Sequence, residues 1–295
     1  MNRRLTLTLA TTAAAATLLA ACGGGDTETA SGESGDPIRI GVVGASEDYW
    51  SAFTELADEE GIDVELVNFT DYTQPNPALS QGQLDLNQFQ HLQYLAAYNV
   101  SNDDDLTPIG ATAIYPLGLY SQKHQSIEDI PDGGQVAIPN DETNQARALL
   151  VLQDAGLITL EGGGSSTSLP SDVVEAESKV TVTPVAAEQT AAALSSVDAS
   201  VINNDFVADA GLEPKDALYQ DQADSPGARP YINVWVARSD DVDNDTFQRL
   251  VELYHSPEVE DASSQASGGT AVFTDNPAGE LSDILDGIQT DLAAH

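Results

Sequence analysis

Basic residues are scarce in this sequence. The 295-residue chain has 10 lysines and arginines against 48 aspartates and glutamates, which gives a formal net charge of −38 at pH 7. Binding to DNA or RNA needs clustered cationic side chains that neutralise phosphates, so nucleic acid is excluded as a partner. The hydrophobic content of 41% is high enough for a folded core and argues against a wholly disordered acidic chain.

Cysteine is nearly absent as well. Because Cys22 stands alone, neither an internal disulfide nor a thiolate-rich zinc site can form. Its position is informative: Arg3 and Arg4 precede an uncharged run rich in Ala, Leu and Thr over residues 5–21, which is the pattern of a secretory signal. No later stretch of the sequence approaches the ~18–20 uncharged apolar residues of a membrane-spanning helix.

The uncharged run ends in Leu-Leu-Ala-Ala-Cys at residues 18–22, which resembles the lipobox of bacterial lipoproteins. In that class the peptide is cut before the cysteine, and the thiol receives a diacylglyceryl group. We therefore expect a signal peptide at residues 1–21 and a lipid on Cys22 that anchors the protein to the extracytoplasmic face of the cell membrane. Two acyl chains hold firmly, since each buried methylene contributes about 0.8 kcal/mol. A buried core cysteine is the weaker alternative.

The remainder of the chain alternates between strand and helix patterns. Residues 22–36 are rich in glycine, serine and acidic residues and predict a flexible spacer. After it, hydrophobic periodicity predicts strands at Ile38–Val43, Val64–Phe69, Leu84–Leu86, Thr107–Ala113, Tyr115–Ser121, Gln135–Ile138, Val180–Pro184, Ala199–Ile202 and Tyr231–Ala237. It predicts helices at Tyr49–Glu59, Gln88–Tyr98, Thr143–Ala155, Ala187–Ser195, Asp205–Ala210, Thr246–His255, Pro257–Ala266 and Ala278–Leu292. This order is typical of an α/β protein with parallel strands and crossover helices, here in two lobes.

Motifs for metal, nucleotide or catalytic chemistry are incomplete. Asp241, Asp243, Asp245 and Glu252 have the spacing of a calcium loop, but Thr246 stands where that loop needs glycine, and the segment fits an amphipathic helix better. The glycine run at residues 162–164 lacks the Gly-Lys-Ser/Thr ending of a phosphate loop. The four histidines show no metal-ligand spacing, and no serine lies in a Gly-x-Ser-x-Gly turn. The sequence therefore indicates no metal, no cofactor and no catalytic residue.

Aromatic and amide side chains gather in three segments, at residues 69–76, 85–95 and 139–147. The first and third lie where a predicted strand ends, which is where α/β folds place ligand-binding loops. In the second, His91 and Tyr94 are three residues apart and are expected to share one helix face. In the third, Asn144 and Arg147 lie near a predicted helix N-terminus, which favours an anion.

At these segments the chain resembles the methionine-binding lipoproteins of bacterial ABC importers, the NlpA-type family. The resemblance extends from about Ile38 to about Ala271. It rests on six strings in order, at Asp71–Asn76, Asp85–His91, Tyr115–Pro116, Val136–Asp141, Val201–Asn203 and Pro230–Asn233. Six ordered matches are far more specific than any one of them.

The resemblance implies a type II periplasmic-binding-protein fold, with two α/β lobes joined by two crossover hinge strands. Lobe 1 is expected to comprise residues 37–117 and 234–295, and lobe 2 residues 118–233. The hinge strands would lie near Tyr115–Leu119 and Tyr231–Val234. The stretch Asp275–His295 lies beyond the clear resemblance and is expected to add an amphipathic helix to lobe 1.

The resemblance also implies a binding site between the lobes. In this family an arginine binds the ligand carboxylate, asparagine amides complete the hydrogen bonding, and aromatic rings surround the thioether. Carried over residue by residue, the site comprises Tyr72, Phe89, His91, Tyr94, Asn144, Arg147, Asn203 and Asn233. Guanidinium–carboxylate pairs and sulfur–ring contacts are both favourable, the latter at ~0.3–1.5 kcal/mol each.

Each site residue also has a plainer interpretation when it is considered alone. Phe89 and Tyr94 fit a hydrophobic core, and Asn203 and Asn233 fit turns or strand ends. Arg147 could form a surface salt bridge with a neighbouring acid, Asp141 or Glu142. The joint occurrence of all eight residues favours the site.

The resemblance thus implies a binding protein that captures methionine and delivers it to the permease of an ABC importer and, through it, to the ATPase subunit. The protein is expected to be a monomer and not an enzyme. Two alternatives remain open. The same scaffold could bind a short methionine-containing peptide or another apolar amino acid, and a more remote alternative is an exported hydrolase.

Overall fold

The structure is a computed structural model that describes residues 35–294. The predicted signal peptide, the lipid-attachment residue Cys22 and nearly all of the predicted spacer lie outside these residues. Within residues 35–294, no helix combines the length and the apolar character needed to cross a bilayer.

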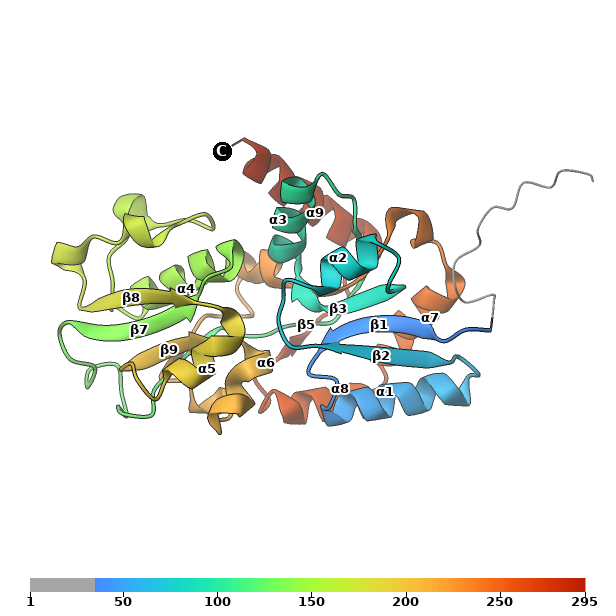
Figure 1. Cartoon of the computed structure of the whole chain (residues 1–295), viewed down its shortest axis with the longest axis horizontal. Coiled ribbons are helices and arrows are strands. Elements are labelled where there is room, and N and C mark those ends of the chain that lie inside the picture. The colour runs from blue at the N-terminus through green and yellow to red at the C-terminus, as the bar shows by residue number, and fades with distance from the viewer. Residues whose placement is uncertain (1–34, 295) are drawn as a thin grey trace, which may run out of the picture.

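Lobe 1 is built around a five-stranded sheet in the order β2-β1-β3-β11-β4 (Figure 1). Strand β1 pairs in parallel with β2 and β3, whereas β11 runs antiparallel between β3 and β4. The strands are β1 (Ile38–Val43), β2 (Val64–Phe69), β3 (Leu86–His91), β4 (Thr107–Ala111) and β11 (Asn233–Ala237). The helices of this lobe are α1 (Asp48–Glu59), α2 (Pro75–Ser80), α3 (Leu92–Asn102), α7 (Asp245–Tyr254), α8 (Pro257–Ala266) and α9 (Ala278–Ala293).

Lobe 2 is built around a second five-stranded sheet, in the order β10-β6-β9-β7-β8. Strand β7 pairs in parallel with β8 and β9, and β6 runs antiparallel to β9 and β10. The strands are β6 (Gly118–Tyr120), β7 (Gly134–Pro139), β8 (Val180–Val185), β9 (Ala199–Ile202) and β10 (Tyr219–Gln220), and the helices are α4 (Glu142–Asp154), α5 (Thr190–Ala193) and α6 (Asn204–Val207).

The chain passes between the two sheets twice. It leaves β4 through β5 (Ala113–Ile114), which pairs with β12 (Val272–Phe273), and enters lobe 2 at β6. It returns from β10 through a 3₁₀ helix at Pro226–Tyr231 and re-enters the first sheet at Asn233. The first passage agrees with the predicted hinge near Tyr115–Leu119. The predicted hinge strand near Tyr231–Val234 was partly wrong, because Tyr231 still belongs to the 3₁₀ helix and the strand begins only at Asn233.

The core of lobe 1 contains a cluster of aromatic rings. Trp50 and Phe53 from α1 pack edge-to-face with ring centroids 5.6 Å apart, and Trp50 meets Trp235 of β11 at 6.0 Å. Tyr254 of α7 completes the cluster, and all four rings are fully buried. Edge-to-face pairs of this kind add about 0.5–1.5 kcal/mol each beyond their area burial. The cluster therefore joins α1 and α7 to the sheet.

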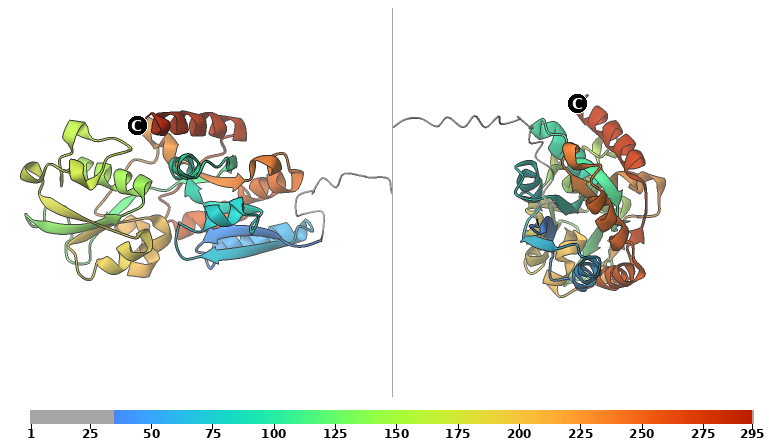
Figure 2. Two further views of the ribbon diagram at one scale, coloured as in Figure 1. Left: turned by 45° about the horizontal axis from the view of Figure 1, so that its top comes forward. Right: turned by 90° about the vertical axis from the view of Figure 1, so that its right-hand side faces the viewer.

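The C-terminal helix α9 confirms the predicted amphipathic helix on lobe 1. Leu281 and Leu285 are buried against lobe 1, and Ile284 and Ile288 are partly buried beside them. The helix packs on α3 and β4, and Figure 2 shows it lying along this lobe.

The segment around residue 90 differs from the sequence prediction. Residues 88–98 were expected to form one helix, but β3 continues to His91 and α3 begins only at Leu92. Every residue of β3 is buried between β1 and β11. The amides of Asn87 and Gln90 are satisfied by each other and by Asn76 of α2, at 2.6–3.0 Å. Because each of these buried amides has a partner, tertiary pairing overrides the helical pattern.

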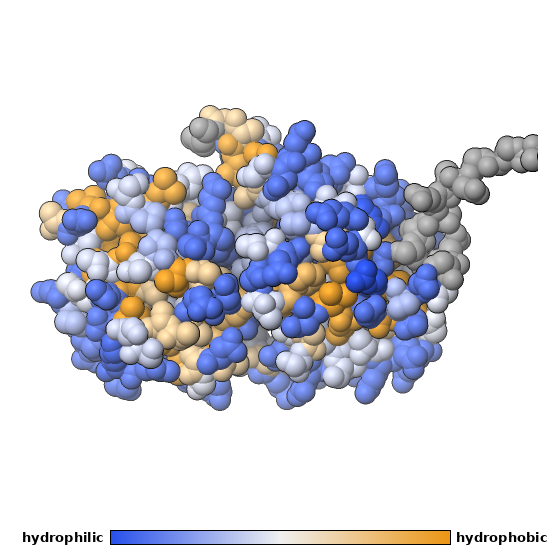
Figure 3. Space-filling model, viewed as in Figure 1, coloured by the Kyte–Doolittle hydropathy of each residue, from blue (hydrophilic) through white to orange (hydrophobic). Residues whose placement is uncertain are grey.

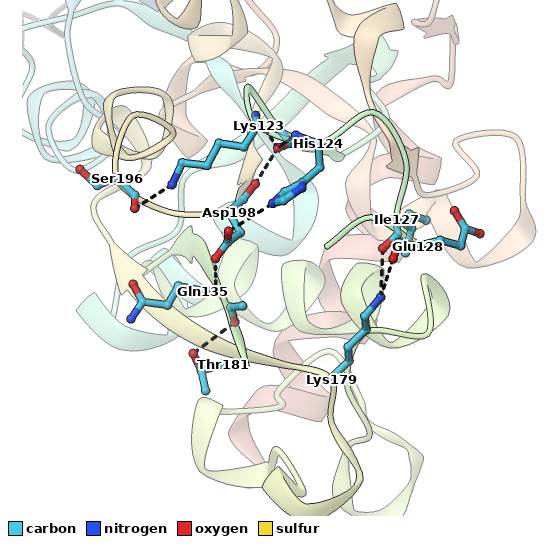
Figure 4. A network of polar contacts seen from close by, with 11 residues as sticks. Lys123, His124, Ile127, Glu128, Gln135, Lys179, Thr181, Ser196 and Asp198 are labelled. Carbon is cyan, nitrogen blue, oxygen red and sulfur yellow. Dashed lines mark hydrogen bonds and ion pairs between the residues drawn. The ribbon is translucent and has the colours of Figure 1, made fainter. Parts of the chain in front are cut away.

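The surface is polar on the face drawn in Figure 3, where hydrophilic residues cover most of both lobes and hydrophobic ones gather in small groups. One polar network ties the loop after β6 to β7 and to the segment just before β9 (Figure 4). In it His124 Nε2 lies 3.2 Å from Asp198 Oδ1, the other oxygen of Asp198 accepts from the Gln135 amide at 2.8 Å, and Lys123 donates to the Ser196 carbonyl at 3.1 Å. His124 therefore has a structural partner in lobe 2.

Candidate ligand-binding site

One cavity between the lobes brings together all the residues predicted for the site. The space in it that no protein atom fills, open solvent included, is about 400 Å³. Its wall includes Tyr72, Phe89, His91, Tyr94 and Asn233 from lobe 1 and Asn144, Arg147 and Asn203 from lobe 2. Six further residues line it, namely Gln90, Tyr115, Pro116, Leu117, Asn204 and Asp205.

Arg147 lies on α4 and is only 4% exposed. Its guanidinium forms a two-point ion pair with Asp221, with Nε 2.7 Å from Oδ2 and Nη2 3.2 Å from Oδ1. Nη2 also donates to the Tyr115 carbonyl at 2.9 Å, and the Tyr231 ring centroid lies 4.1 Å from Cζ. The surface pairing considered for Arg147 was wrong, because its carboxylate partner is Asp221, which is distant in sequence, and not Asp141 or Glu142.

The arginine is thus held in place with part of its hydrogen-bonding capacity unused. In the described contacts of Arg147, Nε and Nη2 donate, and Nη1 makes no hydrogen bond. A guanidinium offers five N–H donors in a plane, so the remaining donors are available to a ligand in the cavity.

The N-terminus of α4 positions Asn144. Asp141 is the N-cap, and its Oδ1 accepts from the Asn144 backbone amide and from the Asn144 side chain, both at 2.9 Å. Asn144 Oδ1 in turn accepts from Asn203 Nδ2 at 2.9 Å. These bonds fix the orientation of the Asn144 amide between two neighbours.

His91 extends this chain of polar groups across the lobes. Its Nδ1 accepts from the Tyr94 backbone amide at 3.1 Å, so the proton must be on Nε2, which lies 3.2 Å from Asn144 Oδ1 and donates to it. Burial, and secondarily the charge of Arg147, lowers the pKa of His91 to about 3. The imidazole is therefore neutral at physiological pH and acts as a hydrogen-bond donor.

Aromatic rings form the other side of the cavity. Tyr72 packs against Phe89 with ring centroids 5.9 Å apart, and Tyr94 meets Phe89 edge-to-face at 5.8 Å. Phe206 of lobe 2 lies 5.2 Å from Tyr72. Phe89 and Tyr72 are buried in a hydrophobic cluster that spans both lobes. Tyr94 is partly buried against the same cluster, so Phe89 and Tyr94 fit the core interpretation while also lining the cavity.

Asn203 and Asn233 both occupy element ends, as their plainer interpretation predicted. Asn203 is the N-cap residue of α6, and Asn233 is the first residue of β11. Both side chains nonetheless line the cavity. Asn203 Oδ1 is buried and has no hydrogen-bond partner within residues 35–294.

Sequence reasoning missed two acidic residues of the site. Asp221 holds Arg147, and Asp205 lines the cavity and accepts a 2.7 Å hydrogen bond from the Tyr72 hydroxyl across the lobes. Burial raises the pKa of Asp205 to about 6. Asp205 follows the string Val201–Asn203 by two residues, which is the only signal that could have found it; Asp221 has no such signal.

The arrangement suits reversible binding of a small polar molecule with an apolar tail. It offers guanidinium donors, several amides and a wall of rings. In the described part of the chain, no group of three or more His, Cys, Asp or Glu residues is placed to hold a metal ion.

Comparison with known proteins identifies the family of this chain. The model of the NlpA lipoprotein family matches residues 38–274. The chain belongs to the NlpA lipoprotein family. A relative from Escherichia coli, the D-methionine-binding lipoprotein MetQ, is 38% identical over 240 residues, which cover 80% of this chain and 87% of that protein.

Two solved structures of similar proteins share the fold. The substrate-binding protein of a methionine transporter from Streptococcus pneumoniae matches with a TM-score of 0.75 at 36% identity, over 81% of this chain and 95% of the other. A nutrient-binding protein from Burkholderia cenocepacia bound to methionine gives a TM-score of 0.74 at 36% identity, over 80% of this chain and 99% of the other. The predicted two-lobed periplasmic-binding-protein fold is thus confirmed. The NlpA match ends four residues before α9, in agreement with the predicted extension.

Proposed function

We propose that this protein is an extracytoplasmic binding protein that captures methionine between its lobes and delivers it to an ABC importer. The observation that carries the proposal is the convergence of Arg147, the His91–Asn144–Asn203 hydrogen-bond chain and the rings of Tyr72, Phe89 and Tyr94 in one cavity. The names of its relatives support the same ligand and the same role.

In this proposal the methionine carboxylate accepts hydrogen bonds from the donors of Arg147 that Asp221 and Tyr115 leave available. Asp221 holds the guanidinium in one orientation, so little conformational entropy is lost when the carboxylate arrives. Asn144, Asn203 and Asn233 supply further hydrogen bonds. The thioether lies against the rings, where sulfur–aromatic contacts contribute about 0.3–1.5 kcal/mol each.

Binding is coupled to closure of the lobes about the two connecting segments. Tyr72 of lobe 1 donates to Asp205 of lobe 2, and His91 donates to Asn144, so that both lobes build one wall. The lobe boundaries would be residues 37–117 with 233–295 and residues 118–232. The second boundary lies one residue earlier than the sequence predicted, because Asn233 begins β11 of the lobe 1 sheet. The ligand-closed form would be recognised by the permease, which passes methionine onward with energy from its ATPase subunit.

The proposal places the protein outside the cell membrane as a monomer, held by a lipid on Cys22 after removal of residues 1–21. It assigns no catalytic role. Among the described residues that line the cavity there is no serine, threonine or cysteine to serve as a nucleophile, which argues against the hydrolase alternative.

One observation favours a peptide as a second candidate ligand. An adjoining cavity shares Tyr115, Asn204 and Asp205 with the first. It could take the N-terminal extension of a short methionine-containing peptide.

Titration calorimetry on the purified protein tests the proposed function. We expect saturable binding of methionine at one site per molecule, with much weaker binding of leucine and glutamine. Methionine and glycyl-methionine can both make the carboxylate contact with Arg147. Tighter binding of glycyl-methionine than of methionine would therefore favour the peptide ligand. Absence of binding by both methionine and glycyl-methionine would refute the proposal.

A further inference from the structure

The cavity has an acceptor side as well as a donor side. A free amino acid carries an ammonium group, whose three N–H donors need buried acceptors when water is excluded. The ligand contacts implied by the family resemblance include no acidic residue. The structure shows one carboxylate in the cavity wall, that of Asp205.

The carboxylate of Asp205 has capacity for further hydrogen bonds. Its Oδ2 accepts from the Tyr72 hydroxyl at 2.7 Å, and its Oδ1 accepts from Asn204 Nδ2 at 2.8 Å. Two carboxylate oxygens offer about four lone-pair sites. Burial raises the pKa of Asp205 to about 6, and the neighbouring charge of Glu47 adds to this. A cation in the cavity would offset the free-energy cost of burying the charge of Asp205.

A second acceptor lies two residues away. Asn203 is only 7% exposed, and its Oδ1 has no hydrogen-bond partner within residues 35–294. Its own Nδ2 donates to Asn144, so the amide cannot flip without losing that bond. A buried acceptor without a partner is costly, and one in a cavity wall points to a ligand donor.

The other acidic residues near the cavity do not line it. Asp221 forms the two-point pair with Arg147, and Asp141 caps α4 through Oδ1, while its Oδ2 is buried without a hydrogen-bond partner within residues 35–294. Glu47 lines only the adjoining cavity. Asp205 is thus the acidic residue of the described chain that faces the ligand space.

We propose that Asp205, together with Asn203 Oδ1, binds the α-ammonium of the ligand and makes a free amino group a requirement for tight binding. The inference rests on the proposed function and extends it. The cavity wall then holds a partner for each charge of a zwitterion, Arg147 for the carboxylate and Asp205 for the ammonium. Analogues without the amino group leave Asn203 Oδ1 without a donor and the buried charge of Asp205 without a counter-charge, and are rejected.

The test compares methionine with 4-(methylthio)butanoate, which is methionine without its amino group, on wild-type protein and on Asp205→Asn. A hydrogen bond to a charged group is worth about 1.5–3 kcal/mol, or about 10- to 100-fold in affinity. We expect Asp205→Asn to weaken the binding of methionine by at least about tenfold and the binding of the analogue by less than about threefold. Because both ligands are measured on the same variant, a partly misfolded fraction cancels in the ratio.

Glu47→Gln is the matched control, since it removes a neighbouring carboxylate that lines only the adjoining cavity. It should change the affinity ratio of the two ligands by less than about twofold. Equal weakening of both ligands by Asp205→Asn, or a larger change of the ratio in Glu47→Gln, would overturn the assignment of the ammonium to Asp205. Failure of the wild-type protein to bind methionine would instead refute the proposed function itself.

Discussion

At the residue scale, the buried charge of Asp205 destabilises the ligand-free folded protein, although the same charge favours ligand binding in our proposal. Burial raises its pKa from 3.8 to about 6, so its ionisation disfavours the ligand-free folded state above pH 6, and this effect vanishes as the pH falls below 3.8. Asp205→Asn should therefore raise the melting temperature of the ligand-free protein at pH 7.5 relative to wild type.

Thermal unfolding of both proteins at pH 7.5 and pH 4 checks this prediction. The gain should shrink at pH 4, where the wild-type carboxyl is largely protonated. The difference between the two pH values isolates the charge from any change in packing. A gain in melting temperature over wild type that is smaller at pH 7.5 than at pH 4 would contradict the interpretation.

The residues of the site differ in how far the sequence could predict them. Arg147 and Asn144 lie three residues apart in the segment 139–147, near a predicted helix N-terminus, and the structure places both in the cavity wall. Asp221 was not predictable, because it is 74 residues from Arg147 and the ion pair forms only when lobe 2 is folded. Nothing local to Asp221 distinguishes it from the other acidic residues of so acidic a chain.

At the scale of elements, contact between β4 and α7 depends on a residue without a side chain. A Cβ atom built on Gly110 of β4 would overlap Val251 Cγ1 of α7. We expect Gly110→Ala to lower the free energy of unfolding by about 1–3 kcal/mol, the usual cost of overpacking. Adding Val251→Ala should recover part of this loss, because it removes the overlapping methyl groups.

Urea denaturation of the single and double variants measures the effect. Gly287→Ala is a matched control, since Gly287 lies inside α9 with open space around its Cβ position. It should be stabilising by about 0.5–1 kcal/mol, because alanine favours a helix interior over glycine. A destabilisation by Gly110→Ala that is unchanged in the double variant would show that the overlap is not its cause.

Elements with clear periodicity were predictable, and those that depend on partners were not. The bounds of β1, β2, β9 and α8 agree with the sequence prediction residue for residue. The segment from Gln88 to His91 has a polar, helix-like pattern, yet it lies in the buried strand β3. Its Gln90 amide pairs with Asn76 of α2 and with Asn87 of the same strand, and its Gln88 amide donates to Thr112. The short helix α2 was likewise hidden in a segment interpreted only as a ligand loop.

At the scale of the whole molecule, the excess of acidic residues opposes the compact state. With 48 acidic residues and 10 basic ones, most carboxylates cannot form an ion pair. Mutual repulsion destabilises a folded protein of such charge, and added salt screens it, with a Debye length of about 10 Å at 0.1 M and 3 Å at 1 M.

The melting temperature should therefore rise steadily between about 0.02 M and 1 M sodium chloride. Potassium chloride at equal ionic strength is the control and should give the same rise, since screening does not depend on the identity of the monovalent cation. A melting temperature that falls with salt would show that ion pairs outweigh the repulsion.

The whole account depends on the binding of a ligand carboxylate by Arg147 between the two lobes. Methionine titration of wild-type protein and of Arg147→Ala tests this most directly, with Arg238→Ala as the control, because Arg238 also pairs with an acid, Asp241, but does not line the cavity. We predict that Arg147→Ala weakens methionine binding by at least about 100-fold while Arg238→Ala leaves it within about threefold. An unchanged affinity in Arg147→Ala would contradict the account.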